Sequence, residues 1–230
     1  MQVGYDLSQM LAGIGIFLLG MNFLEETLKN LAGRSFKLFL RKQTTNKIKA
    51  IGGGALLTGV LQSSSVVNLM VLAFVGAGVL TMQNALAVVL GSNVGATLTS
   101  WIIASLGFKI NIQSLALPIV GIAGVFMAMF KQGRFHQWSK FAFGFGALFV
   151  GLGFIKTGFE DLVINVDFSL FRHYPAIIFL IIGFVITSLI QASSATVALT
   201  LSALYADAIT LPSAMAIVLG SEVGTTVKLL

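Results

Sequence analysis

Long apolar stretches alternate with short polar ones along the chain. Four apolar stretches are uninterrupted and have about the 20 residues that a helix needs to cross a hydrocarbon core: residues 8–31, 84–106, 110–130 and 141–160. Two others, 51–81 and 176–206, are interrupted by a glutamine followed by hydroxyl side chains, and a last one covers 212–230. The pattern predicts an all-α polytopic membrane protein in which some helices are broken.

Composition agrees with a membrane environment. Of the 230 residues, 57% are hydrophobic and 10% are charged, whereas soluble domains have about 25% charged residues. The mean hydropathy is +0.96, and between Ala50 and Phe130 the only ionisable side chain is Lys109. These values exclude an ordinary soluble domain, because its exterior must be largely polar.

Basic residues concentrate in two segments, 29–49 and 131–140. Seven of the 14 lysines and arginines lie in the first: Lys29, Arg34, Lys37, Arg41, Lys42, Lys47 and Lys49. Because basic loops stay on the cytoplasmic side, we expect both segments in the cytoplasm, in a multi-pass protein of the plasma or inner membrane. Residues 33–50 are expected to form a helix on the membrane surface. Such a cluster beside an apolar span indicates contact with the lipid bilayer rather than with nucleic acid.

The position of the two basic segments constrains the stretch 51–81. If both segments are cytoplasmic, the chain crosses the membrane an even number of times between them. The stretches 84–106 and 110–130 supply two crossings, so 51–81 should enter and leave on the same side. A re-entrant hairpin of two half-length segments satisfies this requirement, and two full but broken crossings satisfy it equally.

The sequence contains an internal duplication. A shift of 129 residues places QSSS (62–65) on QASS (191–194) and VVLGSNVGAT (88–97) on IVLGSEVGTT (217–226). A shift of 131 places GIGIFLLG (13–20) on GFGALFVG (144–151). These matches predict a first membrane repeat over 1–130, a cytoplasmic linker over 131–140 and a second repeat over 141–230.

The number of crossings in each repeat sets their relative orientation. The outline gives three full crossings per repeat, and an odd number predicts two inverted-topology repeats, as in many secondary transporters. The first repeat continues to Phe130 after its GSNVGAT run, whereas the chain stops at Leu230 soon after GSEVGTT. An equal second repeat would need about thirty more residues. We therefore expect a shortened chain, or a neighbouring subunit that covers the gap in a homo-oligomer.

The two Gln-x-Ser-Ser runs are candidate binding residues. Polar groups at membrane depth need partners, and non-helical backbone is tolerated there only inside protein or beside water. A single serine pair is explained by bonds to its own helix and by close helix packing. Two such runs at corresponding positions of a duplicated unit instead favour a central site, where unwound segments bind ions.

The runs GSNVGAT (91–97) and GSEVGTT (220–226) allow two interpretations. Each contains the GxxxG pattern of close helix packing. Each also offers oxygen atoms, because Asn93 and Glu222 occupy the same position and threonines follow them. Hard cations such as sodium prefer oxygen ligands, and an ionisable group in an apolar segment suggests a function.

Taken together, the paired runs resemble those of the type II sodium/phosphate cotransporter family. QSSS matches fully, QASS differs by Ala192, GSNVGAT matches with Ala96, and GSEVGTT differs by Glu222. The resemblance covers nearly the whole chain. It implies sodium-driven import of inorganic phosphate by alternating access, with sodium ions as coupling ions and no resident cofactor.

The predicted site residues follow from these runs. The predicted phosphate ligands are Gln62, Ser63, Ser64, Ser65, Gln191, Ser193 and Ser194. The predicted sodium ligands are Asn93, Thr97, Glu222, Thr225, Thr226, Ser64 and Ser193. No metal other than sodium is expected.

Other readings of the sequence remain open. A carrier for another small anion, such as sulfate or a carboxylate, and an ion channel both fit the same pattern. An enzyme does not, because no base lies near either serine run and no GxSxG or HExxH motif is present.

Charged residues near the ends of two spans are expected to be structural. Glu25 and Glu26 should form an interfacial charge pair with Lys29, and Lys156 should pair with Glu160. Asp207 is expected to mark a turn.

Overall fold

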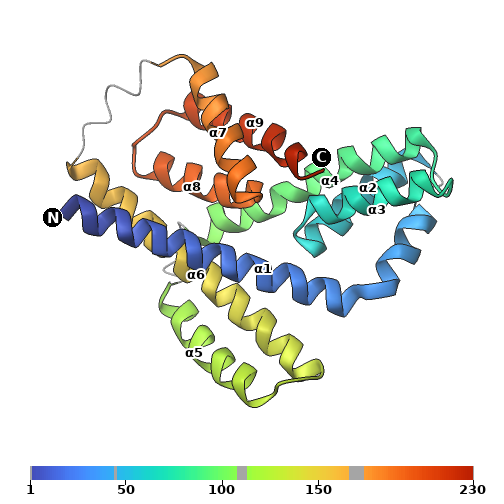
Figure 1. Cartoon of the computed structure of the whole chain (residues 1–230), viewed down its shortest axis with the longest axis horizontal. Coiled ribbons are helices and arrows are strands. Elements are labelled where there is room, and N and C mark those ends of the chain that lie inside the picture. The colour runs from blue at the N-terminus through green and yellow to red at the C-terminus, as the bar shows by residue number, and fades with distance from the viewer. Residues whose placement is uncertain (1, 44–45, 108–112, 166–173, 230) are drawn as a thin grey trace.

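The computed structural model describes residues 2–43, 46–107, 113–165 and 174–229, and the regular elements within these ranges are all helices (Figure 1). In chain order they are α1 (Gln2–Gln43), α2 (Lys47–Leu61), α3 (Ser64–Gly76), α4 (Met82–Ile102), the π-helical turn η1 (Ile103–Gly107), α5 (Gln113–Met129), α6 (Arg134–Asn165), α7 (Ala176–Ile190), α8 (Ser193–Tyr205), α9 (Leu211–Thr225) and the 3₁₀ turn η3 (Thr226–Leu229). The all-α membrane fold predicted from the sequence is confirmed.

Three helical segments are long and apolar enough to cross a membrane: Leu7–Asn30, Met82–Gly107 and Arg134–Ile164. They correspond to the predicted spans 8–31, 84–106 and 141–160. The fourth predicted span is shorter than expected, because α5 has 17 residues. Residues 108–112, where this predicted span begins, lie outside the described residues.

Two predicted helix boundaries are wrong. Residues 33–43 are not a separate surface helix but the continuation of α1, which bends near this end (Figure 1). Likewise, α6 begins at Arg134 and ends at Asn165, beyond both ends of the predicted span 141–160. The reason is physical: hydropathy marks the part of a helix that lies in lipid, whereas polar helix formers extend the same helix into water.

The interrupted stretches 51–81 and 176–206 each form a helical hairpin. For 51–81, this is one of the two arrangements that the sequence allowed. In the first, α2 and α3 meet at Gln62, which has φ 55° and ψ 24°, and in the second α7 and α8 meet at Gln191, with φ 58° and ψ 25°. The next residue is extended in both cases, with φ −147° at Ser63 and −141° at Ala192. A left-handed conformation at a residue other than glycine persists only where the surroundings enforce it.

The turn after each hairpin also repeats. Gly78 has φ 68° between α3 and α4, and Asp207, 129 residues later, has φ 57° between α8 and α9. Thr81 and Thr210 then cap α4 and α9 through their hydroxyl groups. Asp207 therefore marks a turn, as its sequence context predicted.

Glycines hold each hairpin against the helix that follows. A side-chain carbon at Gly91 would overlap the carbonyl oxygen of Ile51 in α2, and one at Gly220 would overlap that of Leu180 in α7. The backbones of α4 and α9 are thus in direct contact with α2 and α7, as expected for small-residue seams in membranes. The duplication is therefore seen in the contacts between helices as well as in the amino-acid sequence.

The helices α1 and α6 form an antiparallel pair (Figure 1). A Cβ built on Gly13 would lie 2.9 Å from the carbonyl oxygen of Gly151, and one on Gly20 would lie 2.7 Å from that of Gly144. In the duplication, Gly144 is the counterpart of Gly13, and Gly151 is the counterpart of Gly20. Gly13 therefore contacts the counterpart of Gly20, and Gly20 contacts the counterpart of Gly13. This reciprocal exchange is consistent with the predicted inverted repeats, which stay a prediction.

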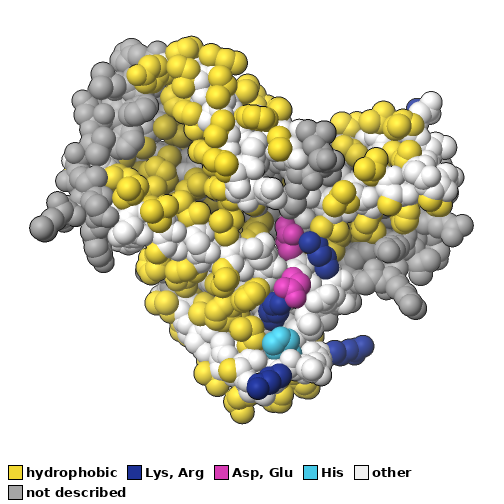
Figure 2. All heavy atoms as spheres, viewed as in Figure 1, with side chains coloured by type: hydrophobic (Ala, Val, Ile, Leu, Met, Phe, Trp, Pro, Cys, Tyr) yellow, Lys and Arg dark blue, Asp and Glu magenta, His cyan; other side chains and the backbone are white. Residues whose placement is uncertain are grey.

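The exterior is largely apolar. Leu11, Leu90 and Trp101 are 63%, 61% and 70% exposed, and hydrophobic side chains cover much of the face in Figure 2, where charged side chains gather in one narrow strip. Soluble monomers rarely expose apolar area on this scale. Lipid contact explains it.

Candidate functional site

A cavity of about 250 Å³ lies where α1, α3, α4, α8 and α9 meet. Pockets for drug-sized ligands have roughly 300–1,000 Å³, and this cavity is smaller. Its size suits a small ion bound together with its counter-ions. Its described lining comprises Glu25, Gln62, Ser63, Ser64, Ser65, Asn93, Ala96, Thr97, Thr99, Ser100, Gln191, Ala192, Ser193, Ser194, Val197, Val218, Glu222 and Thr225.

Corresponding residues of the two repeats line this cavity together. The pairs related by the shift of 129 are Gln62 with Gln191, Ser63 with Ala192, Ser64 with Ser193, Ser65 with Ser194, Asn93 with Glu222, and Ala96 with Thr225. The cavity therefore lies at the interface between the repeats. Of the residues predicted as ligands, Thr226 alone is not among the lining residues. Thr226 is exposed, and its hydroxyl donates to Val223 at 2.7 Å.

The broken hairpins direct two helix starts at the cavity. Ser64 is the first residue of α3 and Ser193 is the first residue of α8, and both line the cavity. Neither preceding residue, Ser63 or Ala192, caps its helix with a side-chain hydrogen bond. Because the first N–H groups of a helix lack partners within it and carry the positive end of its dipole, two such starts favour an anion.

The two glutamines at the breaks have different surroundings. The amide nitrogen of Gln62 donates to the carbonyl oxygen of Gly59, and its oxygen accepts a hydrogen bond from Thr99 at 2.5 Å. This side chain thus joins the first hairpin to α4. Gln191 is exposed to the cavity and makes no side-chain hydrogen bond to another described residue.

Opposite faces of α4 and α9 serve packing and the cavity. Gly95 contacts α2 and Gly224 contacts α7, whereas Asn93 and Glu222, two residues earlier, line the cavity. Positions two apart lie on different faces of a helix. The packing interpretation of the GxxxG runs is therefore confirmed. Sodium binding by the other face stays a prediction, although that face lines the cavity.

Hydroxyl oxygens at the cavity keep lone pairs available. Thr97 donates to the carbonyl oxygen of Val94 at 2.7 Å, and Thr225 donates to that of Ser221 at 3.0 Å. A hydroxyl that donates in this way remains an acceptor, so its oxygen can coordinate a cation. The described residues contain no group of three or more His, Cys, Asp or Glu side chains arranged to hold a metal.

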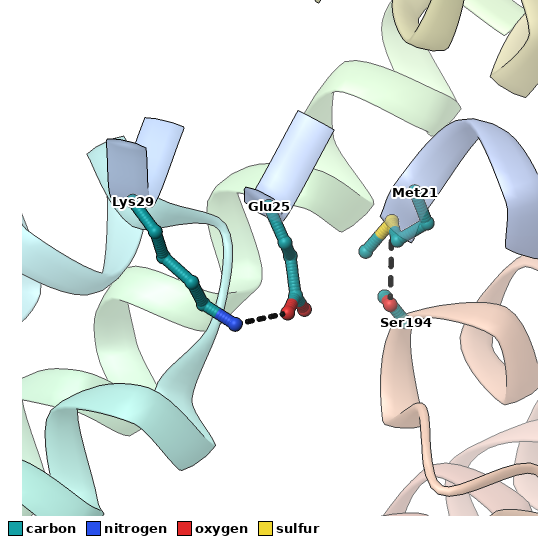
Figure 3. Close-up of polar contacts among 4 residues, drawn as sticks. All are labelled: Met21, Glu25, Lys29 and Ser194. Atoms are coloured by element: carbon teal, nitrogen blue, oxygen red, sulfur yellow. Dashed lines mark hydrogen bonds and ion pairs between the residues drawn. The ribbon is translucent and has the colours of Figure 1, made fainter. Parts of the chain in front are cut away.

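Glu25 is a cavity residue that the sequence did not reveal. The ion pair expected between Glu25 and Lys29 is present, with Lys29 Nζ 3.2 Å from Glu25 Oε2, whereas Glu26 pairs with Lys140 of α6 at 2.6 Å. Glu25 also lines the cavity. Figure 3 places it beside the start of α8, where the hydroxyl of Ser194 lies 3.7 Å from the sulfur of Met21. Nothing local in the sequence connects α1 to α8, so only the fold brings Glu25 here.

Two acidic side chains, Glu25 and Glu222, line the cavity, and Glu25 is paired with Lys29. Among the described residues that line the cavity there is no Lys, Arg or His. Other lining residues that were not predicted are Ala96, Thr99, Ser100, Ala192, Val197 and Val218. An anion bound here would meet hydroxyls, amides and helix starts, and it would need cations to offset the two carboxylates.

Comparison with known proteins gives a consistent result. The family model described as Na+/Pi-cotransporter matches residues 16–157 and 175–230. "Uncharacterized protein YqeW" of Bacillus subtilis is 34% identical over 223 residues, which cover 92% of this chain and 68% of that protein.

Two enterobacterial relatives carry a functional name. The proteins named "Putative inorganic phosphate export protein YjbB" of Salmonella typhimurium and Escherichia coli are each 25% identical over 222 residues. The match covers 95% of this chain and 40% of each of them, so the chain spans less than half of their length. No solved structure matches the chain.

Proposed function

The chain belongs to the Na+/Pi-cotransporter family, and from this membership we propose that it carries inorganic phosphate across the cell membrane together with sodium. The observation that supports this proposal most is the cavity between the repeats, which both Gln-x-Ser-Ser runs line. Transport proceeds by alternating access, with the cavity open to one side of the membrane at a time.

Phosphate binds at the starts of α3 and α8. Serine hydroxyls, glutamine amides and backbone N–H groups can hold phosphate without lysine or arginine. The ligands are those predicted from the two runs, with Ser64 and Ser193 at the helix starts. A site without a fixed positive charge binds the anion weakly, and weak binding permits release.

Sodium binds at the oxygen atoms of α4 and α9. Glu222, Asn93 and the threonines beside them supply carboxylate, amide and hydroxyl ligands. Because Glu25 and Glu222 add negative charge, each bound sodium lowers the free energy of placing phosphate nearby, and phosphate does the same for sodium. This mutual stabilisation couples the two fluxes.

An inverted relation of the repeats, which is part of this proposal, would support alternating access. The reciprocal contacts of Gly13 with Gly151 and of Gly20 with Gly144 are those of antiparallel counterparts. In inverted-repeat transporters, the two repeats exchange conformations around a fixed central site. The same exchange would open this cavity to the opposite side.

The direction of transport has two candidates. An inward sodium gradient drives import, which is our proposal. Export is favoured by one observation, the name of the YjbB relatives. Measuring labelled phosphate flux in both directions across proteoliposomes, with sodium on one side only, distinguishes the two.

The test uses the full chain in proteoliposomes that contain no other transporter. We expect phosphate uptake that rises with an inward sodium gradient and that falls at least tenfold in Ser64→Ala and in Ser193→Ala. Ser139→Ala is the control, because that hydroxyl bonds within α6, to Phe135 at 2.9 Å. Uptake that ignores sodium would refute the coupling, and preferential uptake of sulfate or a carboxylate would refute the choice of anion.

A further inference from the structure

The match between α1 and α6 continues beyond the glycines and ends in reversed charges. At the shift of 131, Phe23 falls on Phe154, Glu25 on Lys156, and Lys29 on Glu160. Both helices therefore carry an i, i+4 ion pair at the same place, but the residue nearer the middle of the helix is acidic in α1 and basic in α6.

Both pairs are formed, and they lie at opposite ends of the α1–α6 pair. Lys29 Nζ is 3.2 Å from Glu25 Oε2, and Lys156 Nζ is 3.9 Å from Glu160 Oε1. The two helices are antiparallel and cross at their glycines, so the C-terminal part of α1 and that of α6 point in opposite directions. One pair belongs to each side of the membrane.

The two pairs differ in their relation to the cavity. Glu25 lines it, and Lys156 is not among its lining residues. Lys156 Nζ instead lies 4.3 Å from the ring centroid of Tyr205, the last residue of α8. The cavity thus reaches the end of the molecule that holds Glu25 and stops short of the end that holds Lys156.

The polar lining shows the same departure from symmetry. Thr97 on α4 lines the cavity, whereas its counterpart Thr226 does not. Under the proposed alternating access, this arrangement corresponds to the conformation in which the cavity faces the Glu25 end.

We propose that Lys156 faces the phosphate cavity in the opposite conformation, so that phosphate binds more tightly from the Lys156 side than from the Glu25 side. This inference rests on the proposed function, since exchange of the two conformations carries Lys156 to the position that Glu25 has now. A carboxylate repels phosphate and an ammonium attracts it. Substituting one for the other at the mouth of the cavity changes the affinity for phosphate by about tenfold or more.

The opposite charges of Glu25 and Lys156 also bear on the direction of phosphate transport. The Glu25 end of α1 adjoins the basic segment 29–49, which the sequence predicts to be cytoplasmic. In that orientation, the Lys156 side, where phosphate binds more tightly, faces the outside of the cell. The Glu25 side, where phosphate binds more weakly, faces the cytoplasm. Capture outside and release inside is the order that import requires.

The experiment measures the apparent KM for phosphate at each face of the membrane separately. Proteoliposomes contain the full chain and a saturating phosphate concentration on one side, and phosphate is titrated on the other. Because the chain has no cysteine, a single Gln132→Cys in the exposed connection between α5 and α6 reports orientation through a membrane-impermeant maleimide.

We expect Lys156→Gln to raise the KM at the Lys156 face about tenfold and to change the KM at the other face less than twofold. Lys156→Arg keeps the positive charge, so its KM for phosphate at the Lys156 face should equal that of the wild type. Glu25→Gln should lower the KM at the Glu25 face. Equal changes at both faces, or a KM that Lys156→Gln leaves unchanged, would overturn the inference even though wild-type protein transports phosphate.

A second measurement is independent of transport. In Lys156→Cys, inorganic phosphate with sodium should slow the reaction with a water-soluble maleimide at least threefold, whereas Gln132→Cys should react at an unchanged rate. No protection at residue 156 would show that it never lies at the phosphate site. Protection without any flux in the wild type would instead retain the site and refute the proposed function.

Discussion

The two hairpins have nearly the same backbone but different hydrogen bonds. Gln62 and Gln191 differ by 3° in φ and by 1° in ψ, as 55° and 24° compare with 58° and 25°. Gln62 bonds to Gly59 and to Thr99, whereas Gln191 makes no side-chain hydrogen bond to a described residue. The glutamine bonds therefore do not cause the break.

Buried hydroxyls differ in the same way. In the second repeat, Thr187 and Thr196 share a buried hydrogen bond of 2.7 Å. In the first repeat their counterparts are Thr58 and Val67, and the buried hydroxyl of Thr58 has no hydrogen-bond partner among the described residues. What the two repeats share is the contact of glycines in α4 and α9 with α2 and α7, the first helices of the hairpins. We attribute the common backbone to these contacts.

The largest effect should come from the glycine contacts. In Gly91→Leu or Gly220→Leu, the new side chain overlaps the carbonyl oxygen of Ile51 or Leu180, so the helices must separate. We expect each variant to lose more than about 3 kcal/mol of unfolding free energy, measured by thermal unfolding in detergent. Gly121→Ala is the control, because nothing lies within 4 Å of its new carbon.

The two hairpins would not depend on the same contacts if one of them tolerated its glycine-to-leucine substitution. A stable Gly220→Leu beside an unstable Gly91→Leu would show that the second break depends on something other than its glycine contact.

The threonine pair should give effects of opposite sign in the two repeats. Thr187→Val leaves Thr196 with a buried hydroxyl that has lost its partner and should cost about 1–2 kcal/mol. Thr58→Val removes a hydroxyl that has no partner and should be neutral or stabilising. Val67→Thr supplies Thr58 with the partner that exists in the second repeat. Chemical denaturation of the three variants measures the differences, and an equal loss in Thr58→Val and Thr187→Val would contradict them.

The smallest effect on stability should come from the glutamines. Gln62→Ala removes the bond to Thr99 and should cost about 1 kcal/mol, whereas Gln191→Ala should cost less than about 0.5 kcal/mol. Both variants should weaken phosphate transport, because both side chains line the cavity. Thermal unfolding and the KM for phosphate, measured on the same preparations, separate the two roles. Equal losses of stability would show that Gln191 is also structural.

Much of the site could be predicted from the sequence, because the duplication identifies pairs without a fold. The breaks at QSSS and QASS and the shared cavity follow from polar runs recurring at a fixed shift. Helix ends could not be predicted in this way, since hydropathy reports lipid contact and not helix length, as the continuation of α1 through 33–43 shows.

Contacts between distant elements were beyond the sequence. The sequence predicts that Glu25 forms an ion pair at the membrane interface with Lys29, and that pair is present. Its place in the cavity depends on how α1 crosses α8, where Met21 meets Ser194. Thr226 shows the converse, because its motif predicts a ligand and the conformation leaves it outside the cavity.

The central claim is that both repeats contribute to one phosphate site, and calorimetric titration of purified protein with phosphate in sodium tests it most directly. We predict one phosphate per chain, weaker binding in both Ser64→Ala and Ser193→Ala, and a double variant whose loss differs from the sum by at least about 0.5 kcal/mol. Two phosphates per chain, or strictly additive losses, would mean that the two serine runs bind separately and would contradict the account.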